Sequence, residues 1–164
     1  MIDIVCFPGT PLDLGFQHVY VLSAFKAVAA QKEELLKRAV QSRHVDFIYN
    51  LEQNPKKDKT NHRASGLNQV YCTFLRDTQI AVAFNLNLLL HAPDRTVILG
   101  RMMQNIRLCR KYKVRMILAS FATHPYEQRA PQDLLAFGRC IGMIGREAKD
   151  ALQFARKMPD VAEI

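Results

Sequence analysis

The fold is decided by residues 80–120, which read IAVAFNLNLLLHAPDRTVILGRMMQNIRLCRKYKVRMILAS. Ile80–Leu86 and Met116–Ser120 are short apolar runs, and each predicts a buried strand. Between them, Asp94 could cap a helix that continues to about Tyr112. A helical crossover between two strands of one sheet makes the strands parallel. The stretch therefore predicts an α/β fold.

The same criteria extend this pattern to both sides. Apolar runs predict further strands over Ile2–Phe7, Phe16–Leu22 and Val45–Leu51. Apolar residues at helical spacing predict helices over Ala24–Ser42, Leu67–Arg76, Pro131–Gly142 and Arg146–Lys157. The polar segment Asn54–Gly66 has no apolar periodicity, so we expect a mobile surface loop there.

Size and composition indicate one globular domain over residues 1–164. The hydrophobic fraction of 49% and the charged fraction of 23% are those of ordinary soluble proteins. No apolar run approaches the roughly 20 residues that cross a bilayer, and the N-terminus lacks the basic stretch of a signal peptide. The four cysteines form no Cys-x-x-Cys pair, which argues against a zinc cluster. We expect a cytoplasmic protein that does not enter membranes.

The net charge of +8 favours association with polyanions. Most of the excess lies in the second half, and no acidic residue occurs between Arg95 and Tyr126. In the helix that ends near Tyr112, the polar residues that can project from one face are Arg101, Gln104, Arg107 and Lys111. Charge alone leaves two interpretations open, a nucleic-acid-binding surface and a solvated basic helix.

Residues for catalysis are sparse. The nucleophile motif Gly-x-Ser-x-Gly and the glycine-rich phosphate loops are missing. A metal site could still form if the fold brought Asp3, His91 and His124 together, although ordinary hydrogen-bonding histidines are the commoner case. Aromatic residues are not interleaved with the basic ones in the manner of single-strand stacking platforms, and Trp is absent, so structured RNA fits this chain better than single strands.

A family resemblance lies between Gly66 and Leu152. The segments that carry it are Gly66–Val70, Ile80–Leu86, Arg101–Tyr112, Met116–Ser120, Arg129–Arg139, Gly142–Met143 and Glu147–Leu152. Together they resemble the ribonuclease P protein component 3 family, known in eukaryotes as the thirty-kilodalton subunit. Before Gly66 the similarity is loose.

The resemblance implies a TIM-barrel-like fold with parallel strands and surrounding helices, related to polymerase and histidinol phosphatase domains but without their metal site. It also implies an accessory role in removing 5′ leaders from precursor tRNA. The ribonuclease P RNA, with its magnesium, would perform the hydrolysis, and this chain would bind no cofactor of its own. The implied partners are that RNA, protein component 2 in a heterotetramer, the other ribonuclease P proteins and precursor tRNA.

Two features depart from the family pattern. The Gly9–Gly15 connection is too short for the helix that the family usually has between its first two strands, and 164 residues is short for a full barrel. We therefore expect a shortened or incomplete barrel.

Charge placement and family likeness together give the candidate RNA contacts. They are Lys56, Lys57, Lys59, Arg63, Arg101, Arg107, Arg110, Lys111, Arg129 and Arg139. For Arg129 and Arg139 a structural role is equally expected. No catalytic residue or metal ligand is assigned. The alternatives are a stand-alone metal-dependent phosphoesterase and a subunit that contacts only proteins.

Overall fold

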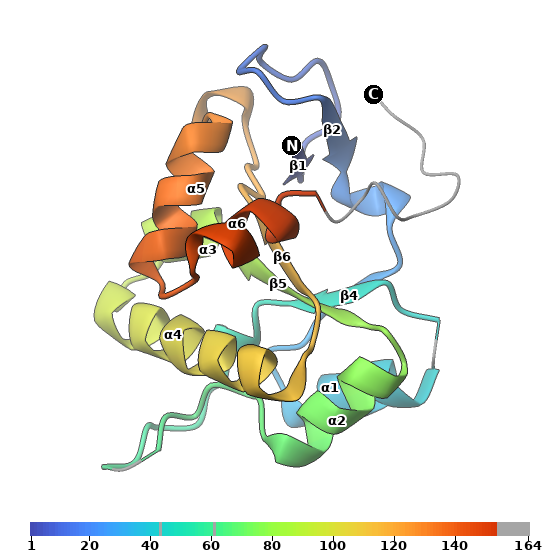
Figure 1. Cartoon of the computed structure of the whole chain (residues 1–164), viewed down its shortest axis with the longest axis vertical. Coiled ribbons are helices and arrows are strands. Elements are labelled where there is room, and N and C mark those ends of the chain that lie inside the picture. The colour runs from blue at the N-terminus through green and yellow to red at the C-terminus, as the bar shows by residue number, and fades with distance from the viewer. Residues whose placement is uncertain (43, 61, 154–164) are drawn as a thin grey trace.

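A computed structural model describes residues 1–42, 44–60 and 62–153 (Figure 1). Its strands are β1 (Ile2–Val5), β2 (His18–Val21), β3 (Ala27–Ala29), β4 (Phe47–Tyr49), β5 (Ala81–Asn85) and β6 (Met116–Ala119). β1 pairs with β2, and β3 to β6 form a four-stranded sheet in chain order. Every ladder is parallel, as the strand–helix–strand units predict.

The two sheets meet where β1 lies beside β6. The backbone N–H of Phe121 donates to the Ile4 carbonyl at 2.8 Å, and that of Cys6 donates to the Ala122 carbonyl at 2.7 Å. The strand order is therefore β3-β4-β5-β6-β1-β2, and no ladder joins β2 to β3 in the described chain.

One apolar cluster receives residues from every strand. Its members include Ile4, Tyr20, Phe47, Ala83 and Ala119, and the partly buried Ala27 packs against it, so that each of β1 to β6 contributes one of these residues. Successive side chains of a strand point to opposite faces of the sheet. Because one face of all six strands contributes to the same cluster, this cluster is the interior of a barrel. The expected α/β fold with a shortened, TIM-like barrel is confirmed.

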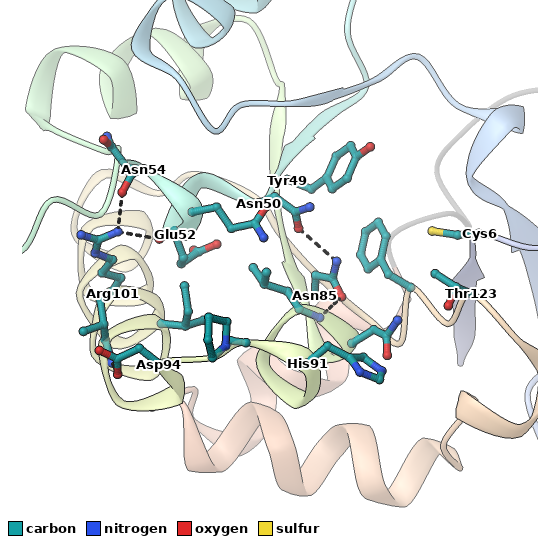
Figure 2. A pocket seen from close by; sticks show the side chains of 18 of the residues that line it. Cys6, Tyr49, Asn50, Glu52, Asn54, Asn85, His91, Asp94, Arg101 and Thr123 are labelled. Atoms are coloured by element: carbon teal, nitrogen blue, oxygen red, sulfur yellow. Dashed lines mark hydrogen bonds between the residues drawn. The ribbon is translucent and has the colours of Figure 1, made fainter. Parts of the chain in front are cut away.

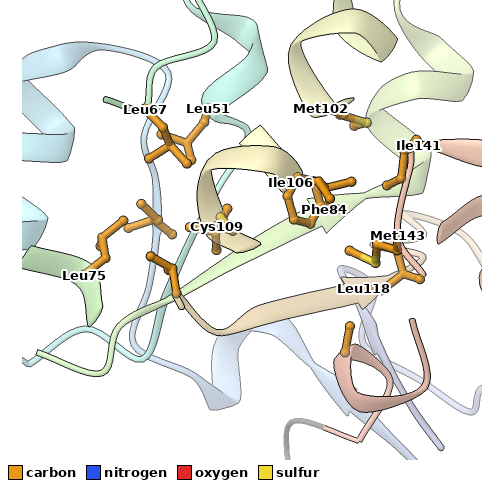
Figure 3. Packing of buried hydrophobic residues seen from close by; sticks show 14 of the residues in the cluster. Leu51, Leu67, Leu75, Phe84, Met102, Ile106, Cys109, Leu118, Ile141 and Met143 are labelled. Atoms are coloured by element: carbon orange, nitrogen blue, oxygen red, sulfur yellow. The ribbon is translucent and has the colours of Figure 1, made fainter. Parts of the chain in front are cut away.

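Helices cover the outside of this barrel (Figure 1). They are α1 (Glu33–Ser42), α2 (Gln69–Asp77), α3 (Leu86–His91), α4 (Arg95–Tyr112), α5 (Pro131–Cys140) and α6 (Gly145–Ala151). Three short 3-10 helices are η1 (Leu22–Ala24), η2 (Leu51–Gln53) and η3 (Pro125–Glu127). Figure 3 shows the outward-facing Phe84 and Leu118 packing with Met102, Ile106 and Cys109 of α4.

α4 has the predicted bounds, and its cap is the predicted one. The Asp94 side chain accepts a hydrogen bond from the backbone N–H of Val97 at 3.1 Å. The strands predicted near Ile2, Phe16, Val45, Ile80 and Met116 are also present, each slightly shorter than predicted. No helix lies between β1 and β2, in agreement with the short Gly9–Gly15 connection.

The helix predicted over Ala24–Ser42 was wrong in its first half. η1 and β3 occupy the chain up to Ala29, and the helix begins only at Glu33. Ala27 pairs with Phe47 of β4, so the edge strand gains a ladder and barrel packing that outweigh the helix propensity of alanine. α3 was not predicted. The Asn85 side chain starts it by accepting from the backbone N–H of Leu88 at 2.9 Å.

Two further expectations concern the ends of the structure. The last helix, predicted over Arg146–Lys157, spans Gly145–Ala151, and residues 154–157 lie outside the described residues. None of the helices in the described ranges is long and apolar enough to cross a membrane.

Candidate nucleic-acid interface

Arg101 is buried, although its sequence position placed it on the charged face of α4. Its Nε donates to Asp58 Oδ1 at 2.8 Å. Its Nη1 donates to the carbonyls of Glu52 at 2.8 Å and Asn54 at 2.7 Å, and its Nη2 donates to the Lys56 carbonyl at 2.7 Å. Only 5% of the residue is exposed. Arg101 therefore holds the chain that follows β4, and it is not among the residues that we propose for RNA.

Hydrogen bonds tie the predicted surface loop to α4. Asp58 Oδ1 also accepts from the backbone N–H of Ala64 at 2.8 Å, which closes the loop on itself. Gln104 of α4 accepts from the Arg63 backbone N–H at 3.2 Å and donates to the Arg63 carbonyl at 3.0 Å. These contacts give the loop a defined position on the helix. Its mobility stays a prediction.

A buried acid lies beneath the loop. Asn105 Nδ2 donates to Glu52 Oε1 at 2.8 Å and to the Ser65 carbonyl at 2.9 Å. Burial raises the pKa of Glu52 to about 7, and the Asn105 hydrogen bond and the nearby Arg101 charge oppose this rise only in part. The carboxyl is therefore partly protonated near neutral pH.

Three exposed cations share one face of α4. The Arg63 guanidinium lies over Gly100, where a side-chain Cβ would be only 2.5 Å from its Cζ. Arg107 and Lys111 lie on the same face of α4. At a rise of 1.5 Å per residue, they are about 10 Å and about 16 Å along the helix axis from Gly100. We call Arg63, Arg107 and Lys111 the basic stripe. Arg63 has a long ion pair to Asp58 at 3.4 Å, whereas Arg107 and Lys111 have no ion pair within residues 1–153 as described.

Other predicted contacts are engaged by protein. Arg110 donates through Nε and Nη2 to the two carboxylate oxygens of Glu147, each at 2.7 Å, and it also holds the Gly142 carbonyl. This pairing lowers the pKa of Glu147. Arg129 donates to the carbonyls of Tyr126 and Gln128 at 3.2 and 2.9 Å. The guanidinium groups of Arg110 and Arg129 therefore stabilise the structure of this chain through these hydrogen bonds.

The remaining cations are on the surface. Lys56 pairs with Glu33 at 2.9 Å. Lys57, Lys59 and Arg139 are exposed and form no ion pair within the described ranges. Among the predicted residues, the cations without an ion pair to another described residue are thus Lys57, Lys59, Arg107, Lys111 and Arg139, and Arg63 is partly compensated. Lys111 Nζ lies 5.4 Å from the centroid of the Tyr112 ring.

The three residues considered for a metal site are engaged separately. Asp3 Oδ1 accepts from the Ser120 backbone N–H at 2.7 Å, and its Oδ2 accepts from the Ser120 hydroxyl at 2.6 Å. Burial raises the pKa of Asp3 to about 6. His91 Nε2 lies 3.1 Å from Glu127 Oε1, and the His124 ring stacks on Tyr126. The described residues contain no cluster of three or more His, Cys, Asp or Glu that could hold a metal ion.

Sequence reasoning missed a pocket at the carboxyl ends of the strands. It has a volume of about 750 Å³ (Figure 2). Its lining includes Tyr49 and Asn85, the last residues of β4 and β5, and Phe121 and Thr123 after β6. These residues are up to 74 positions apart in the chain, so no local motif could have indicated their meeting.

Comparisons with known proteins agree on one family. A sequence model described as RNase P subunit p30 matches residues 22–158. Ribonuclease P protein component 3 of Methanosarcina mazei is 36% identical over 111 residues, which cover 64% of this chain and 46% of that protein. Its counterpart in Methanococcoides burtonii is 30% identical, with 77% and 50% covered. The chain spans about half the length of these curated relatives.

A solved structure matches the fold. A chain in the cryo-EM structure of archaeal ribonuclease P with mature tRNA superposes with a TM-score of 0.68 at 18% identity, covering 95% of this chain and 65% of that one. The family match extends over most of the sequence, from η1 through α6, and so includes the strand–helix–strand unit that decided the fold. The chain belongs to the RNase P subunit p30 family.

Proposed function

We propose that this chain is a protein subunit of archaeal ribonuclease P and supports the catalytic RNA in removing 5′ leaders from precursor tRNA. Family membership carries the proposal, because the curated relatives are ribonuclease P components. In this proposal the RNA subunit and its magnesium perform the hydrolysis, in the cytoplasm, and no side chain of this protein is assigned a catalytic role.

The basic stripe is the proposed contact to RNA phosphates. Its three cations lie on one face of α4, in a chain with no acidic residue from Arg95 to Tyr126. α4 is packed against the barrel through Met102 and Ile106, so the backbone positions of Arg107 and Lys111 along the helix are fixed. A fixed row of cations suits structured RNA, which proteins recognise largely by phosphate, sugar and shape.

Further cations extend this surface. Lys57 and Lys59 on the loop and Arg139 on α5 complete the set that we propose for RNA. Arg101, Arg110, Arg129 and Lys56 are left out of this set because they make the protein contacts described above.

We also propose protein component 2 as a direct partner in a heterotetramer, together with the other ribonuclease P proteins and precursor tRNA. The family resemblance supports this assignment. Copurification of the assembled particle with and without this chain tests it, and a particle that retains component 2 equally well in the chain's absence would contradict a direct pairing.

A salt titration tests the basic stripe. A plot of log affinity against log salt concentration has a negative slope, and each lost phosphate contact makes this slope less steep by roughly 0.7–0.9. The double variant Arg107→Gln/Lys111→Gln should therefore bind ribonuclease P RNA more weakly, and the steepness of its slope should decrease by about 1.5. Lys37→Gln on α1 is the matched control, because Lys37 is exposed and lies off α4. Equal slopes for the double variant and the wild type would refute the assignment.

A further inference from the structure

The pocket at the strand ends is not used by the function proposed above. In α/β barrels this end of the strands is where ligands bind. Here the pocket reaches from Cys6 and Thr123, which follow β1 and β6, to Asn54 and Arg101 beside the loop (Figure 2). Apolar side chains form much of its wall, among them Leu22, Leu88, Val97 and Ile98.

An aromatic surface forms one side of the pocket. The rings of Tyr49 and Phe121 stack with their centroids 5.4 Å apart and their planes 16° from parallel. Phe121 is 1% exposed and is fixed in the barrel interior, whereas Tyr49 is partly exposed. The buried ring thus holds the partly exposed one in place, and a flat apolar surface is available at the pocket.

A pre-oriented amide lies beside these rings. Asn85 Oδ1 is occupied by the Leu88 N–H, so its Nδ2 is the donor that reaches Asn50 Oδ1 at 3.0 Å. This bond orients the Asn50 amide, whose Nδ2 has no hydrogen-bond partner within the described residues. Asn50 also has a left-handed backbone, with φ of 58°, a conformation that asparagine adopts more readily than most residues with a side chain.

The charges of the lining argue against an anionic group inside the pocket. The Arg101 guanidinium is fully engaged by Asp58 and three carbonyls, and His91 pairs with Glu127. Asp94 caps α4. A ligand inside the pocket should therefore carry no negative charge, and the aromatic surface and the Asn50 Nδ2 donor favour a planar group with an acceptor.

We propose that this pocket binds an unpaired nucleobase of RNA, stacked on Tyr49 and accepting a hydrogen bond from Asn50. A second pocket, lined by Lys56 and Lys57, adjoins this one at Asn54, which lines both. The phosphates of the bound RNA would therefore lie outside the base pocket, near Lys57. Unstacked bases are commonly held in this way, on aromatic rings and by amide contacts to their edges. The inference rests on the proposed function, since it takes the ligand to be RNA.

Two variants separate base binding from phosphate binding. Tyr49→Leu removes the stacking ring, and Asn50→Gly removes the amide while glycine accepts the left-handed backbone. The probes are a nine-nucleotide single-stranded RNA and an abasic ribose-phosphate oligomer of the same length, titrated against the full chain. Tyr49→Leu should weaken binding of the RNA by roughly 5- to 150-fold, and Asn50→Gly by roughly 2- to 10-fold. Binding of the abasic oligomer should not change. Circular dichroism and urea midpoints confirm that both variants fold.

The control is Arg107→Gln/Lys111→Gln, which should weaken both oligomers and lower the salt slope. Wild-type binding of the RNA by both pocket variants would overturn the base pocket and leave the basic stripe standing. Unchanged RNA binding with weakened binding of component 2 would also overturn it, because the pocket would then dock a protein. If the control binds as the wild type does while Tyr49→Leu loses the RNA, the basic stripe fails and the pocket stands.

Discussion

Arg101→Gln should destabilise the protein far more than a neighbouring arginine substitution. The change removes the guanidinium from Asp58 and from the carbonyls of Glu52, Asn54 and Lys56. Removing one member of a buried ion pair costs about 3–5 kcal/mol. The Asp58 side chain is 20% exposed, so water can solvate it in part. We therefore expect a loss near the lower end, about 3 kcal/mol.

Urea denaturation followed by circular dichroism measures this loss. In a chain of this length, about 3 kcal/mol corresponds to a fall in Tm of roughly 6–12 °C. The matched control is Arg107→Gln, six residues along the same helix, which should change the free energy of unfolding by less than about 0.5 kcal/mol. Equal losses in the two variants, or a loss below about 1 kcal/mol for Arg101→Gln, would refute the structural role of Arg101.

Other substitutions test the buried acid and the helix packing. Burial raises the pKa of Glu52 from 4.5 to about 7, so the folded state holds the proton more tightly than the unfolded state does. The free energy of unfolding should fall as the pH rises through this window, and Glu52→Gln should remove much of the fall between urea titrations at pH 5 and pH 8. A methyl group at Gly138 would lie 2.8 Å from a Leu118 methyl carbon, so Gly138→Ala should cost about 1–3 kcal/mol despite its better helix propensity. Gly100→Ala meets only the movable end of Arg63, so it should be neutral or stabilise by up to about 1 kcal/mol. A larger loss for Gly100→Ala than for Gly138→Ala would contradict the packing.

Local signals in the sequence were sufficient for β5, α4 and β6, although not for α3 between them. α4 follows from an apolar stripe, a capping Asp94 and flanking apolar runs, all within about 40 consecutive residues. β3 could not be predicted in the same way. Its three residues, Ala27–Ala29, form a strand because β4 lies beside them, and that pairing is a tertiary contact.

The sequence could not rank the arginines of α4. Arg101 and Arg107 have the same chemistry and similar neighbours, so both were predicted to contact RNA. What separates them is a set of backbone carbonyls between Glu52 and Lys56, 45 to 49 residues before Arg101. Those carbonyls need donors once they are buried, and a guanidinium supplies several at fixed angles.

The aromatic surface formed by Tyr49 and Phe121 also could not be predicted from local sequence patterns. Aromatic and basic residues are not interleaved in the manner of single-strand stacking platforms, which favoured structured RNA over single strands. Tyr49 and Phe121 stack only because β4 and β6 both end at the same mouth of the barrel. A periodicity search within one segment cannot detect such a pair.

The most direct test of the account is the rate of precursor tRNA cleavage by ribonuclease P RNA at low magnesium, with component 2 present. Three reactions are compared, one without this chain, one with the wild type, and one with Arg107→Gln/Lys111→Gln. We expect faster cleavage with the wild type, and a smaller gain with the double variant that shrinks further as salt is raised. Equal rates with and without the wild-type chain would contradict the account.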